Sequence, residues 1–118
     1  MSTQTLLIVD DSRLSRMMIK NFANEIQPDW NIIEAKDGDD ALKVIEGESI
    51  DWMTVDYNMP GMDGITLIGH LRKGFPEAKI ALLTANIQDS IKKRSSELGV
   101  EFIQKPITQD KIFNYIKS

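Results

Sequence analysis

The sequence IDWMTVDYNMPGMDG, residues 50–64, decides the fold of this chain. Its first part, from Ile50 to Val55, is mostly apolar with β-branched and aromatic side chains, as is typical of a strand buried on both faces. Asp56 ends this run, and a proline and glycines follow as turn residues. Since open α/β sheets bind ligands beyond the carboxyl ends of their strands, Asp56 lies where a ligand would be expected. An aspartate that starts a turn is also common in ordinary loops, so the other strand ends must decide.

Four other short apolar runs are typical of strands, and they cover residues 5–9, 30–34, 78–83 and 100–104. Helical patterns separate the runs. Four of these helices are expected to begin after residues that can cap an N-terminus, namely Ser12, the turn over 37–39, Asp63 and Thr108. The remaining helix, over residues 87–98, is polar and weak and stops at Gly99. The alternation of strand and helix predicts a parallel sheet with helices on both faces.

The apolar spacing also predicts which helix faces point inward. In the first helix Leu14, Met18, Phe22 and Ile26 recur every fourth residue, with Met17 and Ile19 beside them. In the last helix we expect Ile112, Phe113 and Ile116 to face the core.

Length and composition exclude several classes of protein. A chain of 118 residues predicts one domain, since it is long enough for one core but not for two. The net charge of −4 argues against nonspecific binding to nucleic acid or to an anionic membrane. No cysteine is present, which excludes disulfides and thiolate chemistry. No apolar run approaches the roughly 20 residues of a membrane span, and no export signal is visible, so we expect a cytoplasmic protein without membrane insertion.

Polar residues follow four of the expected strands. Asp10 and Asp11 follow the first, Asp56 the third, Thr84 the fourth and Lys105 the fifth. If the three carboxylates share a site, the first and third strands are neighbours and the second lies outside the first. The predicted order is then 2-1-3-4-5, a flavodoxin-like doubly wound (βα)5 arrangement. Two carboxylates ~4 Å apart repel by ~4 kcal/mol at an effective dielectric near 20, so we expect a retained proton or a hard cation such as Mg²⁺.

The loop after the third strand resembles the phosphoacceptor loop of response regulator receivers through Asp56, Met59, Pro60, Met62, Asp63 and Gly64. The acidic pair, Thr84-Ala85 and Lys105-Pro106 match the same family in order and spacing, and the resemblance covers the whole chain. The predicted strand order is partly taken from chemotaxis receivers, which have this order.

The resemblance implies roles for these residues. Asp56 would be the phosphoacceptor, with Thr84 and Lys105 contacting the phosphoryl oxygens. Asp11, Asp56 and the backbone carbonyl of Asn58 would ligate Mg²⁺, with Asp10 acting more through a water. The Lys105-Pro106 peptide would be cis. Thr84 and Phe102 would be the switch residues, whose movement transmits the effect of phosphorylation out of the site.

The implied function is a phosphorylation switch of two-component signalling. A histidine kinase or a small acyl phosphate would supply the phosphoryl group, and the chain would catalyse only its own phosphorylation and dephosphorylation. Residues 1–118 would form a single receiver domain of the stand-alone chemotaxis kind, with no output domain, although a receiver excised from a longer protein fits the sequence as well. A downstream protein would dock on the helix over 87–98, the strand over 100–104 and the last helix.

Two alternative functions fit parts of the sequence. A flavodoxin-like carrier of FMN would use the same fold, but it needs a phosphate loop rich in Ser, Thr and Gly after the first strand. The sequence there, Asp10-Asp11-Ser12-Arg13, would repel a phosphate in the absence of metal. A degenerate receiver that serves only as a protein-binding module is the second alternative. The complete set of five polar strand-end residues argues against it.

Overall fold

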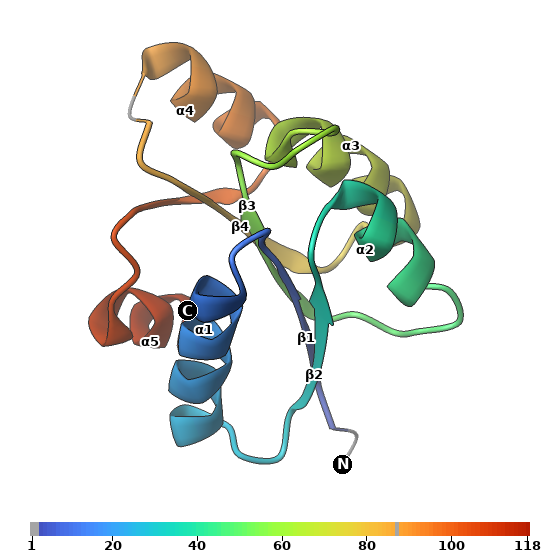
Figure 1. Cartoon of the computed structure of the whole chain (residues 1–118), viewed down its shortest axis with the longest axis vertical. Helices are drawn as coiled ribbons and strands as arrows, with labels where there is room; N and C mark the ends of the chain where they lie inside the picture. The colour runs from blue at the N-terminus through green and yellow to red at the C-terminus, as the bar shows by residue number, and fades with distance from the viewer. Residues whose placement is uncertain (1–2, 87) are drawn as a thin grey trace.

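A parallel sheet of five strands, with helices on both faces, is the frame of the molecule (Figure 1). The computed structural model describes residues 3–86 and 88–118. The elements are β1 (Thr5–Val9), α1 (Arg13–Ile26), β2 (Asn31–Ala35), α2 (Gly38–Val44), β3 (Trp52–Asp56), α3 (Gly64–Gly74), β4 (Lys79–Thr84), α4 (Asp89–Glu97), β5 (Glu101–Gln104) and α5 (Gln109–Ile116). The strand order is β2-β1-β3-β4-β5, which confirms the order and the flavodoxin-like fold predicted from the sequence.

The register of the sheet brings the acidic residues to one edge. β1 pairs with β3 so that Val9 lies opposite Val55. Asp10 follows Val9 and Asp56 follows Val55 along these two neighbouring strands, and both residues therefore lie at the carboxyl edge of the sheet. The third strand begins at Trp52 rather than at Ile50 and includes Asp56. The other strand ends differ by one residue at most from the predicted ranges. The predicted start of the fourth helix, at residue 87, lies outside the described residues.

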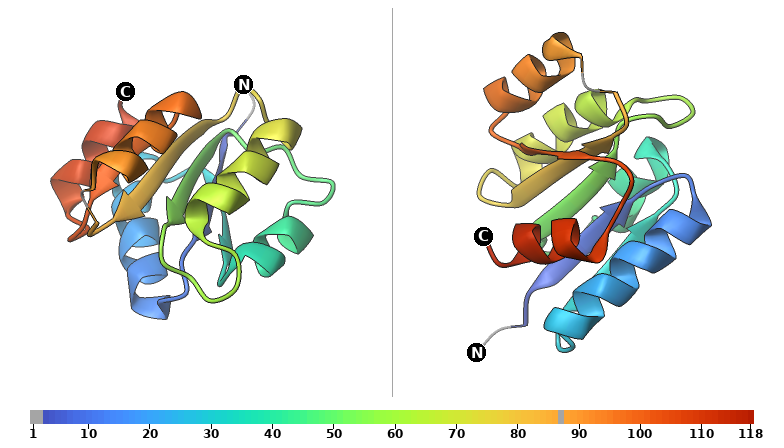
Figure 2. Two further views of the ribbon diagram at one scale, coloured as in Figure 1. Left: turned by 90° about the horizontal axis from the view of Figure 1, so that it is seen from above. Right: turned by 90° about the vertical axis from the view of Figure 1, so that its left-hand side faces the viewer.

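The strands alternate their side chains between two separate apolar cores. Leu7, Val9 and Val55 face α2, α3 and α4, whereas Leu6 and Ile8 face α1 and α5. Figure 2 shows α1 and α5 side by side on one face of the sheet. Both faces are covered, which is why the strands read as continuous apolar runs instead of alternating ones. None of the helices in the described ranges is long and apolar enough to cross a membrane.

Side-chain caps fix where the helices begin. Ser12, Asp37, Asp63 and Thr108 each accept a hydrogen bond from the backbone N–H three residues further on, as the sequence predicted. Gly99 ends α4 with a φ of 67°, a conformation that residues with a Cβ rarely adopt.

The predicted inner faces of α1 and α5 are partly wrong. Leu14 and Met17 are 65% and 48% exposed, and Ile19 and Ala23 are the buried residues of α1. A row of residues four apart drifts around a helix by about 40° per step, so it does not stay on one face. In α5 the buried aromatic residue is Tyr115 rather than Phe113.

Tyr115 fastens α5 to the middle of the sheet. Its hydroxyl lies 2.8 Å from the backbone oxygen of Met53 in β3 and 2.7 Å from that of Lys79 in β4. Burial raises the pKa of Tyr115, so the hydroxyl keeps its proton and remains a donor to these carbonyls.

Gly64 lets the start of α3 approach the end of β3. A Cβ at Gly64 would collide with the backbone oxygen of Asp56 and would lie 2.9 Å from the Cα of Tyr57. We therefore expect Gly64→Ala to lower the free energy of unfolding by about 1–3 kcal/mol.

Gly69, in the same helix, is the control, because a Cβ added there would have no heavy atom within 4 Å. Gly69→Ala should raise the free energy of unfolding by up to about 1 kcal/mol through helix propensity. Urea unfolding of both variants checks the pair, and equal effects would contradict this account.

Candidate functional site

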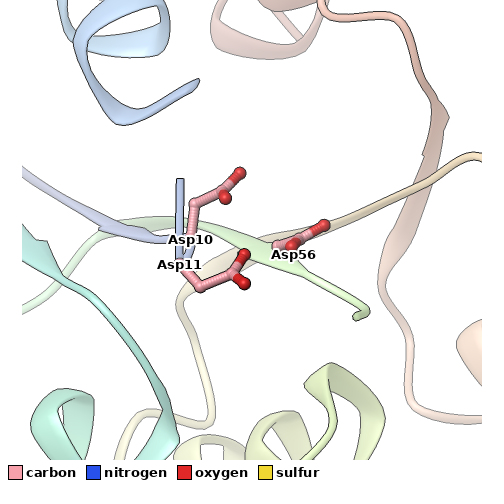
Figure 3. A group of neighbouring side chains, drawn as sticks. All are labelled: Asp10, Asp11 and Asp56. Carbon is pink, nitrogen blue, oxygen red and sulfur yellow. The ribbon is translucent and has the colours of Figure 1, made fainter. Parts of the chain in front are cut away.

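Three carboxylates converge beyond the ends of β1 and β3. Asp10, Asp11 and Asp56 each place one oxygen within 4.8 Å of the others, and Figure 3 shows the side chains leaving these two strand ends. Asp10 and Asp56 are buried, with 1% and 4% exposure, while Asp11 is exposed. The sequence prediction that these three residues share a site is confirmed in its geometry. The cluster has a buried inner part and one carboxylate that faces solvent.

Lys105 provides the positive charge of the site. Its Nζ lies 2.8 Å from Oδ1 of Asp56 and 3.8 Å from Oδ2 of Asp10. The backbone N–H of Lys105 donates to the backbone oxygen of Thr84 at 2.9 Å, which holds the end of β5 against the end of β4. The Lys105-Pro106 peptide is cis, as the family resemblance implied. One ammonium therefore faces two buried carboxylates.

Thr84 lies at the neighbouring strand end and is almost fully buried. Its Oγ1 accepts a hydrogen bond from the backbone N–H of Asn86 at 3.0 Å. That bond uses a lone pair of the oxygen, so the hydroxyl hydrogen is still available to donate. Asn58, in the loop after Asp56, is exposed.

Phe102, the expected switch residue, lies within β5. Its ring is half-buried and packs against the core on the α2–α4 face. The Nζ of Lys92, in α4, lies 5.7 Å from the centroid of that ring, within the range of a cation–π contact. Phe102 thus contacts both the core and α4.

Burial dominates the electrostatics of the carboxylates. It raises the pKa of Asp56 to about 6, although the hydrogen bond from Lys105 opposes the shift, and the negative charge of Asp10 adds to it. Burial also raises the pKa of Asp10, against the backbone hydrogen bond from Ser12. For Lys105, burial alone would lower the pKa, but the hydrogen bond and the charge of Asp56 outweigh burial and raise it. The lysine therefore stays charged while the carboxylates are destabilised as anions.

The residues present fit a hard divalent cation. The side-chain oxygen Oδ2 of Asp10 is buried and has no hydrogen-bond partner within the part of the chain that the structure describes. A buried acceptor without a partner is costly, and a cation or its water would satisfy it. The side-chain atoms that could ligate a metal are all carboxylate oxygens, and together they carry more negative charge than Lys105 offsets. Mg²⁺ prefers such oxygen ligands.

Two contacts that hold Asp10 were not found from the sequence. The backbone N–H of Ser12 donates to Oδ1 of Asp10 at 2.9 Å, and Nη1 of Arg16 donates to the backbone oxygen of Asp10 at 2.7 Å. The signal for the first is the Asp-x-Ser spacing, which is typical of an aspartate turn. The second depends on how α1 crosses the sheet, which sequence periodicity does not show.

Comparisons with known proteins agree on one family. Residues 6–117 match the family model described as the response regulator receiver domain. The chain is 33% identical to chemotaxis protein CheY of Listeria monocytogenes over 118 residues, which cover 95% of this chain and 94% of that protein. It is also 33% identical to the cyclic di-GMP phosphodiesterase response regulator RpfG of Xanthomonas campestris, covering 86% of this chain but only 28% of RpfG.

A solved structure supports the same conclusion. A complex of CheX, CheY, BeF3 and Mg²⁺ from Borrelia burgdorferi contains a chain that superposes with a TM-score of 0.86 at 28% identity. The superposition covers 96% of this chain and 86% of that one.

The raised pKa of Asp56 predicts an unusual pH dependence of stability. Its folded pKa of about 6 exceeds the usual value of 3.8, so the folded state binds more protons between these pH values. Stability due to this group is therefore present at low pH and lost as the pH rises through about 6. Without divalent cations, the free energy of unfolding of the wild type should fall between about pH 4.5 and about pH 7.5 by about 2 kcal/mol more than that of Asp56→Asn.

Urea unfolding at the two pH values measures this difference. Asp29→Asn, which removes an exposed carboxylate from the turn between α1 and β2, is the control and should behave like the wild type. The same pH dependence in Asp56→Asn and wild type would contradict the assigned shift.

Proposed function

The chain belongs to the response regulator receiver family, and on that premise we propose that it is a phosphorylation switch whose phosphoacceptor is Asp56. The observation that carries the proposal is the contact between the buried Asp56 carboxylate and Lys105 beside two further carboxylates. Lys105 pairs with Oδ1 of Asp56. A carboxylate oxygen of Asp56 attacks the phosphorus of the donor, and the bond between phosphorus and the donor's leaving group breaks as the acyl phosphate forms.

The surrounding side chains act on the charge of the phosphoryl group. The Lys105 ammonium offsets negative charge on one phosphoryl oxygen, and the free hydrogen of the Thr84 hydroxyl is donated to another. Mg²⁺, when bound, supplies further charge neutralisation. Asp11, Asp56 and the backbone carbonyl of Asn58 would hold the ion, with Asp10 acting through a water. The exposed position of Asp11, and the Asp10 oxygen that has no hydrogen-bond partner among the described residues, support this division.

The phosphoryl donor is a histidine kinase or a small acyl phosphate, and the chain catalyses only its own phosphorylation and dephosphorylation. We further propose that residues 1–118 form one receiver domain of the chemotaxis kind, acting in the cytoplasm. The near-complete overlap with the Listeria CheY supports this. Direct contact with nucleic acid or insertion into a membrane is not part of the function, in keeping with the net charge of −4.

The signal leaves the site through Thr84 and Phe102 to a docking surface formed by α4, β5 and α5, which lie along one end of the sheet (Figure 1). The two ends of α4 are held unequally. Its N-cap, Gln88, makes no side-chain capping bond within the described part of the chain. At the other end, Arg72 of α3 donates to the backbone oxygens of Leu98 and Gly99. The start of α4 is instead tied to Thr84 through Asn86, whose Oδ1 accepts from the Gln88 N–H and whose N–H donates to Thr84 Oγ1. It should therefore follow a movement of Thr84, and Lys92 connects α4 to Phe102.

The two alternative functions are less well supported. The match to the receiver family covers residues 6–117, and an FMN carrier is not favoured by it. A degenerate receiver would lack part of the acidic cluster, Thr84 or Lys105, whereas all five side chains lie at the ends of their strands on one edge of the sheet.

The phosphoacceptor is tested by incubating the protein with acetyl phosphate and Mg²⁺ and measuring the intact mass. We expect one added phosphoryl group in the wild type and in the control Asp29→Asn, and none in Asp56→Asn. Asp11→Ala should fail because it no longer binds Mg²⁺, which a separate Mg²⁺ titration would show. Labelling of Asp56→Asn at the wild-type level would refute the assignment.

The output route is tested by mapping amide chemical shifts with and without beryllofluoride, which stands in for the phosphoryl group. Because phosphorylation adds about −1.5 to −2 charge and strong acceptor oxygens, Thr84 should move toward the site. We expect shift changes at Thr84, Phe102 and the first turn of α4, and smaller ones at Leu98, where Arg72 holds the helix. Changes confined to the loop after Asp56 would exclude this route.

A further inference from the structure

Arg16 connects α1 to the end of β1 and to the edge strand β2. Its side chain is only 16% exposed. Nη1 donates to the backbone oxygen of Asp10 at 2.7 Å, and Nε lies 3.2 Å from Oε1 of Glu34 in β2. The planar guanidinium can hold a carbonyl and a carboxylate at once, because its donors point in fixed directions.

The contact fixes the backbone just before the exposed member of the acidic cluster. The N–H of Asp10 donates to the backbone oxygen of Ala35 at 3.1 Å, so both backbone polar groups of Asp10 are bonded. The carbonyl of Asp10 and the nitrogen and Cα of Asp11 belong to one planar peptide unit. Arg16 therefore fixes the plane from which the Asp11 side chain leaves the backbone.

Asp11 depends on this backbone more than the other two carboxylates do. Asp10 is held by the Ser12 N–H and Asp56 by Lys105. Within residues 3–86 and 88–118, no hydrogen bond or ion pair engages the Asp11 side chain. Its direction toward Asp56, visible in Figure 3, depends on the position of its backbone and on its own rotamer, and among the described residues no side-chain partner holds it.

We propose that Arg16 is a positioning residue for divalent cation binding: by holding the Asp10–Asp11 peptide, it aims the Asp11 carboxylate into the acidic cluster. Among the described residues, the polar contacts of Arg16 are to the Asp10 backbone oxygen and to Glu34, not to the carboxylate oxygens of the cluster, and so we assign it a positioning role rather than a catalytic one. The inference rests on the proposed function, since it gives a role to a residue beside the same site.

Glu34 acts in this arrangement as the anchor of Arg16. Its second oxygen lies 3.9 Å from Nζ of Lys20, one turn further along α1. Lys20 shares this anchor, but the structure gives it no bond to Asp10 among the described residues. Lys20→Met is therefore a matched control, because it removes a positive charge from the same helix face and the same carboxylate without touching the Asp10 carbonyl.

The first test is a direct titration with Mg²⁺. Binding is measured by isothermal calorimetry and by the changes in the amide signals of Asp10 and Asp11. Loss of an outer contact of a metal site typically weakens binding by about 10–100-fold. We expect the Mg²⁺ dissociation constant of Arg16→Met to rise about tenfold. Arg16→Lys keeps one donor and should recover most of the affinity, while Lys20→Met should equal the wild type.

The outcomes separate this inference from the proposed function. A wild type that does not bind Mg²⁺ would contradict both. Normal Mg²⁺ binding by a folded Arg16→Met, or equal losses in Arg16→Met and Lys20→Met, would overturn only the role of Arg16. The amide spectrum of each variant shows that it is folded. If Arg16→Met does not fold, Glu34→Gln provides the test, because it keeps Arg16 but removes its anchor and should still weaken Mg²⁺ binding by a few-fold.

A second measurement distinguishes a role of Arg16 in orienting Asp11 from a role in the phosphoryl transfer step. If Arg16 only orients Asp11, saturating Mg²⁺ should restore the geometry. The Mg²⁺ concentration that half-saturates phosphorylation by acetyl phosphate should then rise about tenfold in Arg16→Met, while the rate at saturation stays within about twofold of the wild type. A lowered saturating rate with unchanged half-saturation would overturn the positioning role.

The anchor is tested by a double-mutant cycle. Glu34→Gln should weaken Mg²⁺ binding by a few-fold, because Arg16 keeps its bond to Asp10 but loses its orientation. Adding Glu34→Gln to Arg16→Met should cause no further loss, since both act through one contact. Additive effects would show that Glu34 acts on the site separately, and would overturn its role as the anchor.

Discussion

Repulsion among three carboxylates at one edge of the sheet is the constraint on which the site depends. The register of β1 against β3 forces Asp10 and Asp56 together in a place from which water is largely excluded, and Asp11 completes the cluster. Lys105 neutralises only part of this charge, so burial still raises the pKa of both inner carboxyl groups. The folded chain gives up stability here, as functional sites commonly do. A bound cation relieves the same repulsion, which couples the fold to its ligand.

In the proposed switch, the backbone around the cluster would pass the effect of a phosphoryl group out of the site. The N–H of Lys105 is bonded to the carbonyl of Thr84, so the ends of β4 and β5 are joined directly behind the carboxylates. Phe102 lies in β5, the strand that leads to Lys105, and its ring contacts Lys92 of α4. To move a two-state equilibrium between the resting and the shifted position of α4 from 1:99 to 99:1, phosphorylation would need about 5.5 kcal/mol of differential stabilisation. Under the proposed function, a docking partner that prefers the shifted α4 would add to the effect of the phosphoryl group.

Most of the fold could be predicted because it depends on local patterns. Apolar runs indicated the strands, capping residues such as Ser12 and Asp63 indicated the helix starts, and the shared site of Asp10 and Asp56 indicated the strand order. Predictions that needed the packing of whole elements were less successful. The exposure of Leu14 and the burial of Tyr115 depend on how α1 and α5 lie on the sheet. The contact of Arg16 with the Asp10 carbonyl joins two elements, and no spacing within one helix reveals it.

The most direct test of the central claim is to locate the phosphoryl group itself. The protein would be treated with acetyl phosphate with and without Mg²⁺, the acyl phosphate trapped by borohydride reduction, and the modified residue identified by peptide mass mapping. The account predicts modification at Asp56 alone, and only when Mg²⁺ is present. Modification at Asp10 or Asp11, or equal modification of Asp56 without Mg²⁺, would contradict it.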